Sequence, residues 1–361
     1  SVPQAKARLF PDLRLSYEHL DTEQDIKSSD NTVFGSGSTS FPTKTFGAVL
    51  TQPIFRFGEW QALKQSHAKV SQAVADLTAA RQRHLLRVSQ IYLGGLAAED
   101  DLEFARAERA AVESQLNLAA RRRQSGLATR TDEYDAQARF SLIVSNEIEA
   151  ENRLDDARQA LLVTSGQLIE ELDPLSAEIT LALPDPATAE AWVSRSIEQN
   201  LLLEARRQAV EIAEREIRRQ KSGHYPTLDL VLRLDDRDTE GSLFGGGSQV
   251  ETADIAVQFN LPLFQGGGTR SRVRQATFEY SQARQELRLE QYQVSREARS
   301  SFLGVISGVS KVQALDDAVT AQQSALESKR RGYQSGINTA LHVLDAERDL
   351  YLIKRDYAQA R

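Results

Sequence analysis

The segment QPIFRFG, residues 52–58, has a counterpart 209 residues later in LPLFQGG, residues 261–267. A second segment, RRRQSGL at residues 121–127, returns after 210 residues as RGYQSGI at residues 331–337. Repetition at a nearly constant shift indicates that the chain contains two copies of one structural unit. The sequence around and between these segments therefore decides the fold.

Each copy carries the heptad spacing of a coiled coil between its two segments. The seven-residue lattice is occupied by Leu63, Val70, Leu77 and His84 and, 210 residues later, by Val273, Tyr280, Leu287 and Val294. This spacing predicts one long helix in each copy. At 1.5 Å per residue, each helix would reach on the order of 100 Å.

A Ser-Gly turn ends each long helix, and a segment with helical composition follows the turn. We therefore predict two antiparallel helical hairpins, at about residues 59–168 and 269–361. Glycines interrupt both long helices at matching positions, Gly94-Gly95 in the first and Gly304 with Gly308 in the second. A bend or short break would form most easily there.

Ahead of each hairpin the sequence alternates with period two, which predicts strands. The apolar half of this alternation in the second copy is Leu228, Leu230, Leu232 and Leu234. The four predicted strands cover about residues 11–20, 45–55, 226–235 and 252–264. Two segments rich in small and polar residues join the strand pairs and are predicted to be solvent-facing loops: residues 31–45 and 239–250.

The predicted fold class is mixed α and β, built from two internal repeats. The first repeat covers residues 1–175. The second repeat covers residues 176–361, and it opens with a short strand at about residues 178–183 and a helix at about residues 187–222.

Composition excludes several classes of protein. Among 361 residues there are 44 Lys and Arg against 51 Asp and Glu, a net charge of −7, and there is no Cys. An acidic chain is a poor counter-ion for nucleic acid, and without Cys it has no disulfide, thiolate zinc site or cysteine nucleophile. No run approaches the roughly 18 apolar residues that a transmembrane helix needs.

Known catalytic and ligand-binding motifs are also missing from the sequence. It holds no H-E-x-x-H, G-x-S-x-G, phosphate-cradling or dinucleotide fingerprint. Its histidines form no metal-ligand spacing, and they are His19, His67, His84, His224 and His342. We therefore predict no enzyme, no catalytic, cofactor-binding or metal-binding residues, no cofactor and no nucleic-acid partner.

The strands point to a membrane and to self-association. Strands of about ten residues with one apolar and one polar face match a bilayer-spanning β-strand. Because the smallest membrane barrels need about eight strands, four cannot close one, whereas a threefold assembly would supply twelve. The alternative is a soluble sheet packed on helices, but helices this long cannot fold back to cover such a sheet.

Several of these features together resemble the TolC family of outer-membrane efflux and secretion ducts. They are the twofold repeat, the strand ends QPIF and LPLF followed by Gly, and the tip YQSG at residues 333–336 with Thr339 and VLDA at residues 343–346. The resemblance covers essentially the whole chain. The ordered set, present twice, is specific although no single motif is.

This resemblance implies a homotrimer with a twelve-stranded barrel in the bacterial outer membrane and a helical barrel extending through the periplasm. It implies a passive exit duct for small toxic molecules or secreted proteins, in contact with outer-membrane lipid. The duct would dock through a periplasmic adaptor protein onto an inner-membrane pump. The alternative, a soluble coiled-coil scaffold or adaptor, leaves the four strands without a role.

In the family a helix precedes the first strand of each repeat. The second repeat here has that helix, and its counterpart before Pro11 is missing. We therefore expect the sequence to lack part of the N-terminus of its family, and the final helix also stops early.

The resemblance assigns the helical tips to adaptor docking. The tip surface comprises Ser125, Gly126, Leu127, Thr129, Ser335, Gly336 and Thr339. An alternative explanation is local: Gly suits the left-handed residue after a helix, and the basic last turns suit its negative end.

The resemblance also implies a periplasmic aperture just beyond the tips. The aperture set comprises Thr131, Asp132, Tyr333, Asn338, His342 and Asp345. Asn338 stands where the founding member has an arginine and His342 where it has an aspartate, so the ion-pair latch and the acidic ring are both expected to be weaker. His342 could make the ring charge pH-dependent, or it could merely pack on a neighbouring helix.

Four residues mark the predicted passage from strand to helix in the two repeats. This junction set comprises Pro53, Gly58, Pro262 and Gly267. Aromatic residues near the strand ends could form an interfacial girdle or simply pack, and they are Tyr17, Phe55, Phe57, Trp60 and Phe264.

Overall fold

The structure, a computed structural model, describes residues 1–28, 37–126, 128–167, 169, 171–176, 181–241 and 246–361. It divides into two compact units, and each contains parts of both repeats. Unit 1 comprises Ser1–Thr78 and Gln199–Gln293. Unit 2 comprises Ala79–Glu198 and Val294–Arg361.

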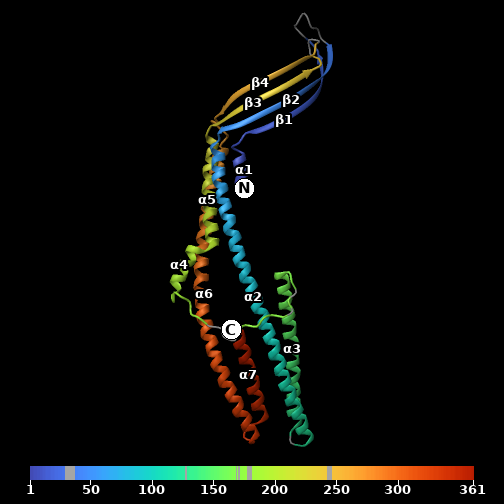
Figure 1. The fold of residues 1–361 in the computed structure, drawn as a ribbon, viewed down its shortest axis with the longest axis vertical. Coiled ribbons are helices and arrows are strands. Elements are labelled where there is room, and N and C mark those ends of the chain that lie inside the picture. Colours follow the sequence, from blue (N-terminus) through green and yellow to red (C-terminus); the bar gives the residue numbers. More distant parts are fainter. Residues whose placement is uncertain (29–36, 127, 168, 170, 177–180, 242–245) are drawn as a thin grey trace. The chain divides into compact units, whose positions relative to one another are not determined.

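Figure 1 labels the elements along the chain. In order they are α1 (Val2–Ala7), β1 (Asp12–Ile26), β2 (Gly37–Phe55), α2 (Phe57–Gln124), α3 (Arg130–Ser165), α4 (Ala189–Gln199), α5 (Leu201–Lys221), the 3-10 turn η1 (Ser222–His224), β3 (Thr227–Thr239), β4 (Ser248–Asn260), α6 (Gly268–Gln334) and α7 (Ala340–Ala360). The mixed fold class with four strands and very long helices is confirmed.

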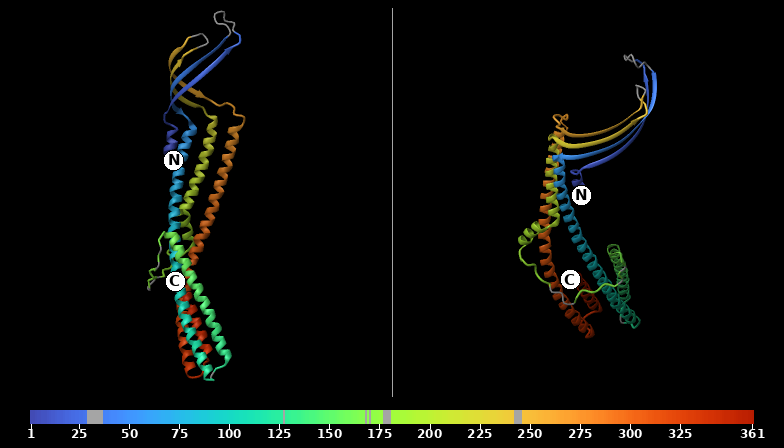
Figure 2. Two further views of the ribbon diagram at one scale, coloured as in Figure 1. Left: turned by 90° about the vertical axis from the view of Figure 1, so that its right-hand side faces the viewer. Right: turned by 45° about the horizontal axis from the view of Figure 1, so that its top comes forward.

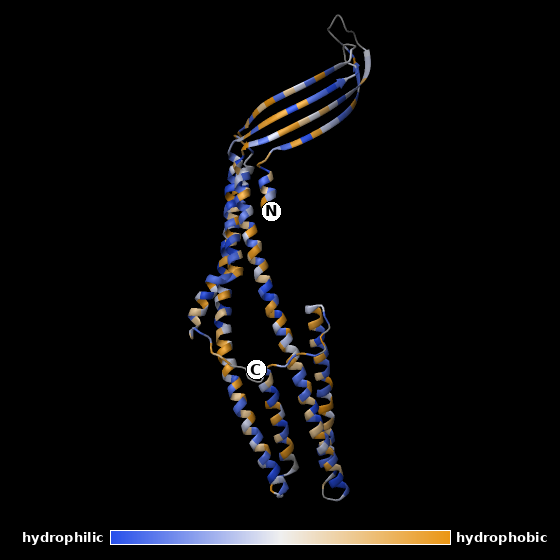
Figure 3. Cartoon of the chain, in the orientation of Figure 1, coloured by the Kyte–Doolittle hydropathy of each residue, from blue (hydrophilic) through white to orange (hydrophobic). Residues whose placement is uncertain are grey.

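Unit 1 contains a four-stranded antiparallel sheet in the order β1-β2-β3-β4. Its register places apolar residues opposite one another across the strands, as in the row Leu13, Leu50, Leu232 and Ile255. Residues directly opposite share a face of the sheet, so these rows form one apolar face. The alternation of hydrophobic and hydrophilic residues along each strand is visible in Figure 3.

The strands are longer than the ten residues predicted, with 15, 19, 13 and 13 residues. Pairing continues beyond the apolar rows into polar ones, such as Glu23 opposite Ser40, so the sequence alternation marks only part of the ladder. β2 begins at Gly37, so residues 37–45 of the predicted loop are strand, while residues 29–36 lie outside the described residues. The prediction that the fourth strand continues to residue 264 is wrong because β4 ends at Asn260, just before Pro262, which cannot donate to a ladder.

An ion pair joins the end of β2 to β3 at the start of the helices. The Arg56 guanidinium donates from Nε to Asp229 Oδ1 at 2.8 Å and from its terminal nitrogen to Oδ2 at 2.9 Å. The register slips between Pro53 and Phe55 at the same place. This bidentate pair fixes the corner at which the chain leaves the sheet and enters α2.

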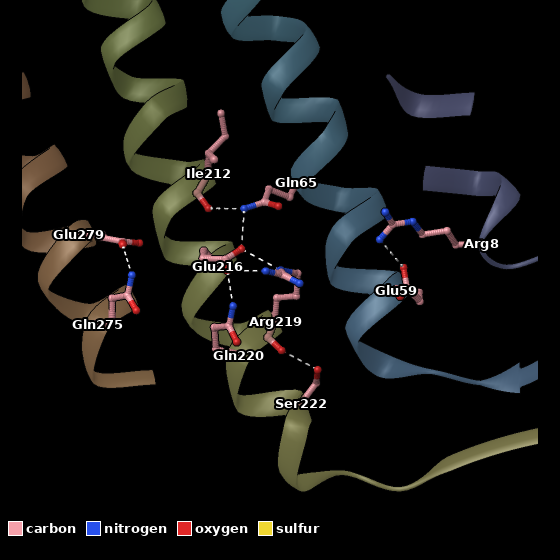
Figure 4. Close-up of polar contacts among 10 residues, drawn as sticks. All are labelled: Arg8, Glu59, Gln65, Ile212, Glu216, Arg219, Gln220, Ser222, Gln275 and Glu279. Carbon is pink, nitrogen blue, oxygen red and sulfur yellow. Dashed lines mark hydrogen bonds and ion pairs between the residues drawn. The ribbon is translucent and has the colours of Figure 1, made fainter. Parts of the chain in front are cut away.

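A polar network ties α5 to α2 within unit 1 (Figure 4). Gln65, which is buried, donates to the backbone oxygen of Ile212 and to the Glu216 carboxylate, both at 3.1 Å. Arg219 donates to the same carboxylate at 2.8 and 2.6 Å. The hydrogen bond from Arg219, assisted by those from Gln220 and Gln65, lowers the pKa of Glu216 to about 2.

Two predictions for the chain around these elements need correction. The helix predicted at 187–222 is split into α4 and α5, because Asn200 Oδ1 accepts from the N–H groups of Leu202 and Leu203 and so starts a new helix. Residues 178–180 of the predicted short strand lie outside the described residues, and residues 181–183, which are described, carry no helix or strand. Before the first strand of the first repeat the structure contains the six-residue helix α1.

Unit 2 contains the far parts of both hairpins, in which α2 lies beside α3 and α6 beside α7 (Figure 2). The first hairpin buries the cluster Ala98, Leu102, Ala150 and Leu154. The second buries the cluster Leu326, Val343, Ala346 and Leu350. α2 and α6 run through their glycines without a break.

Hydropathy along the helices is low. Among the described residues, no helix has a stretch apolar and long enough for a membrane span.

We predict that Glu216→Gln lowers the thermal unfolding midpoint at pH 7 by roughly 2 °C or more, because it removes charge-assisted hydrogen bonds. A pKa depressed from 4.5 to about 2 contributes stability that is present above the unfolded value and lost as the pH falls through the folded one. The difference in unfolding midpoint between the variant and the wild type should therefore disappear as the pH falls from 4.5 to 2.

The matched control is Glu214→Gln, which removes an exposed pair with Arg218 on the same helix. It should leave the midpoint nearly unchanged across the same pH series. A midpoint for Glu216→Gln equal to that of the control at pH 7 would contradict the role assigned to the network.

Candidate functional site

The tips of the two hairpins have the same backbone geometry. Gly126 and Gly336 have φ angles of 75° and 79°, in the left-handed region that L-residues avoid. The N–H of Gly126 donates to Arg123 O at 3.0 Å and that of Gly336 to Tyr333 O at 3.2 Å, which closes the last turn of each helix. Neither glycine has an atom within 4 Å of the place where a Cβ would stand, so both face open space.

Hydroxyl groups complete the turns at both tips. Ser125 Oγ donates to Arg121 O at 3.1 Å, and Ser335 Oγ donates to Arg331 O at the same distance. Thr129 and Thr339 are the N-caps of α3 and α7. The local explanation for the tip residues therefore holds for their backbone geometry, and Leu127 lies outside the described residues.

The caps of the return helices differ in their third residue. In α3 this residue is Asp132, whose carboxylate accepts from the N–H and the hydroxyl of Thr129, both at 2.8 Å. These two hydrogen bonds, the backbone one first, hold the pKa of Asp132 below its ordinary value. In α7 the corresponding residue is His342, whose side chain is exposed and forms no such capping box.

A cavity of about 460 Å³ lies between the two tips within unit 2. Its lining includes three members of the aperture set, Asp132, Tyr333 and Asn338, and two of the tip surface, Gly336 and Thr339. Two arginines outside the tip and aperture sets also line it: Arg122, from the basic last turn of α2, and Arg139 of α3.

Tyr333 lies under one of these arginines. The Arg122 guanidinium carbon is 4.9 Å from the centre of the Tyr333 ring, a cation–π arrangement that joins α2 to α6. The Tyr333 hydroxyl is buried and has no hydrogen-bond partner among the described residues. Asn338 turns back onto its own hairpin, where its amide donates to Lys329 O at 3.3 Å.

Asp345 pairs with the second arginine. A terminal nitrogen of Arg139 on α3 donates to Asp345 Oδ1 on α7 at 3.1 Å, and Arg348 lies 3.9 Å from the same oxygen. Thr131, His342 and Asp345 do not line this cavity. The structure therefore brings half of the aperture set together and pairs Asp345 with a residue outside it.

The missed arginines carried a weak sequence signal. Arg139 lies seven residues after Asp132, two helical turns along the same face of α3. Spacing along one helix does not say which residue of another hairpin will stand opposite, so pairing with Asp345 needed the packed structure.

The junction set occupies different local positions in the two repeats. Pro53 lies within β2 at the register slip, and Pro262 lies between β4 and α6. Gly58 is the second residue of α2, where a Cβ would stand 2.7 Å from Ser222 Oγ. Gly267 has a φ of 80° and directly precedes α6.

Comparison with known proteins addresses the family directly. The sequence model of the family described as outer membrane efflux protein matches residues 1–167 and 192–361. The chain belongs to this family. The outer membrane protein TolC of Vibrio cholerae is 30% identical over 363 residues, covering 100% of this chain and 81% of that protein.

Other relatives extend the likeness within the family. TolC of Escherichia coli is 31% identical, with 100% of this chain and 73% of that protein covered, and the proteases secretion protein PrtF of Dickeya chrysanthemi is 27% identical, with 100% and 78% covered. Among solved structures, the Vibrio cholerae outer membrane protein VceC matches with a TM-score of 0.82 at 19% identity, covering 99% of this chain and 85% of that one.

Family membership settles the class of function and the location. The chain is an outer-membrane exit duct of the efflux and type I secretion class, and it extends into the periplasm. The resemblance inferred from the sequence is confirmed, and the soluble scaffold interpretation is set aside. Its role is transport, and within the described residues no three of His, Cys, Asp and Glu form a metal-binding group.

We predict that Thr129→Ala destabilises the first turn of α3 by about 1 kcal/mol, because it removes a capping box. Thr339→Ala should cost less, since its hydroxyl accepts a single bond of 3.4 Å from His342. Amide hydrogen exchange at residues 130–133 and 340–343 measures both effects. Equal acceleration in the two helices would contradict the difference between the caps.

Proposed function

We propose that three copies of this chain close one twelve-stranded barrel and form a passive duct through the outer membrane. The observation that carries this proposal is the state of the sheet in a single chain. Among the described residues β1 and β4 each pair on one side only, which leaves two open edges. Ile255 is 77% exposed and Leu15 67%, so the apolar face is uncovered as well.

The open strand edges and the uncovered apolar face are both accounted for by a closed barrel in a membrane. A membrane offers no water to satisfy an open strand edge, so sheets cross membranes only as closed barrels. Four strands are too few to close one, and three copies supply twelve. The opposite face would then line a wet lumen with residues such as Arg14, Arg233 and Asp254, which lie with Val49 in one row across the four strands.

The duct would dock through its tip surface onto a periplasmic adaptor protein and, through it, onto an inner-membrane pump. Open space around Gly126 and Gly336 supports this role, because another backbone can approach closely there. The aperture set would form the gate just beyond the tips, and the junction set would mark where the barrel passes into the helices.

The duct itself would perform no chemistry, since the energy for export would come from the pump. Relatives at similar identity include a protease secretion protein and general efflux proteins, so the chain alone does not select between small molecules and secreted proteins. We propose that the partner pump chooses the cargo.

We predict that Gly126→Trp and Gly336→Trp abolish export while trimers remain intact, because the large side chains would stand on the docking surface. Export is measured as drug resistance of cells that depend on this duct, and trimers are measured by mass in detergent.

Gly166→Trp is a matched control. Gly166 also has a positive φ, 73°, and open space at its Cβ position, but it caps the other end of α3. It therefore carries the same backbone strain without occupying a tip. Normal export by both tip variants, or loss of export in the control as well, would contradict the docking role.

A further inference from the structure

The two hairpins of unit 2 are each held together internally by charged side chains. In the first, Arg109 donates to the buried Glu147 at 2.9 Å, and Arg106 lies 3.0 Å from Glu151. In the second, Arg330 donates to Glu347, which is also buried, at 2.7 Å. Each hairpin can therefore move as one body, and the links between hairpins decide whether the tips stay together.

Three aperture residues that line the cavity make no hydrogen bond across it to the other hairpin within the described residues. The Asp132 carboxylate is occupied by Thr129 of its own hairpin, and the Asn338 amide by Lys329 of its own hairpin. The Tyr333 hydroxyl finds no partner among the described residues. Within the described part of the chain, none of these three therefore makes a hydrogen bond or ion pair between the hairpins.

Two arginines outside the aperture set do cross between the hairpins. Arg139 on α3 reaches Asp345 on α7 at 3.1 Å, and Arg122 on α2 covers the ring of Tyr333 on α6. Both arginines line the cavity between the tips. We propose that Arg139 is a positioning residue that holds the two hairpins of each subunit together and so keeps the duct closed, with Arg122 in support.

This inference rests on the proposed function of the duct, because it assigns a closed state to the tips. Arg139 and Asp345 have side chains that are each 35% exposed, so the pair is neither buried nor fully screened. An exposed pair shifts an equilibrium about 1.5- to fivefold. Three copies acting together would shift closing roughly threefold to a hundredfold.

Arg139 can be substituted without leaving an unpaired carboxylate on α7. When it is removed, Asp345 keeps Arg348 at 3.9 Å on its own helix, so no buried unpaired charge is created. We therefore expect Arg139→Gln to fold, to form trimers and to raise the open probability of single channels in a planar bilayer by roughly threefold to a hundredfold. Arg139→Lys keeps the charge and should stay close to wild type.

Arg106→Gln is the matched control, because it removes ion pairs that lie within one hairpin, to Glu151 at 3.0 Å and to Glu147 at 3.7 Å, and Glu147 keeps its hydrogen bond from Arg109. Its open probability should equal that of wild type. A second test uses the absence of native cysteines: Arg139→Cys with Asp345→Cys, joined by a bismaleimide, should close the channel again.

These measurements distinguish failure of the proposed duct from failure of the role proposed for Arg139. A wild-type protein that forms no channel overturns the proposed duct. A wild-type channel whose open probability is matched by Arg139→Gln, or is raised as much by Arg106→Gln, leaves the duct in place and overturns the role of Arg139. Failure of the crosslinked variant to close would do the same.

Discussion

The open edges of a four-stranded sheet constrain everything else in this molecule. β1 and β4 each present a row of backbone groups that the described part of the chain does not pair. The same sheet has an apolar face, and exposing that face to water is unfavourable. One chain can satisfy neither requirement. Association in a membrane satisfies both at once, since neighbouring copies pair the edges and lipid covers the face.

The two helical hairpins come from the same repeat, but the first turns of their return helices differ. Both tips have a left-handed glycine and a threonine cap, yet α3 carries Asp132 at the third position and α7 carries His342. A carboxylate suits the positive end of a helix, and the imidazole of His342 brings no such negative charge. The first hairpin is thus tied more firmly at its tip than the second, which leaves closure to contacts between hairpins such as Arg139 with Asp345.

Much of the fold could be predicted because each element repeats a local pattern. The heptad spacing predicted the long helices, and the period-two alternation predicted the strands. The short break considered at Gly94-Gly95 is not present, because α2 is continuous through both glycines. Strand ends were missed where pairing continues with polar residues on both faces, as at Glu23. Contacts between hairpins carry no local pattern, so the contacts of Arg122 with Tyr333 and of Arg139 with Asp345 could not be found from spacing alone.

The central claim is that open edges of one copy are closed by the next. A cryo-electron microscopy map of the detergent-purified protein tests it most directly. The account predicts three copies around one axis, with β1 of each copy hydrogen-bonded to β4 of its neighbour in a twelve-stranded barrel. A particle containing one copy with both edges unpaired, or one in which β1 pairs with β4 of the same copy, would contradict it.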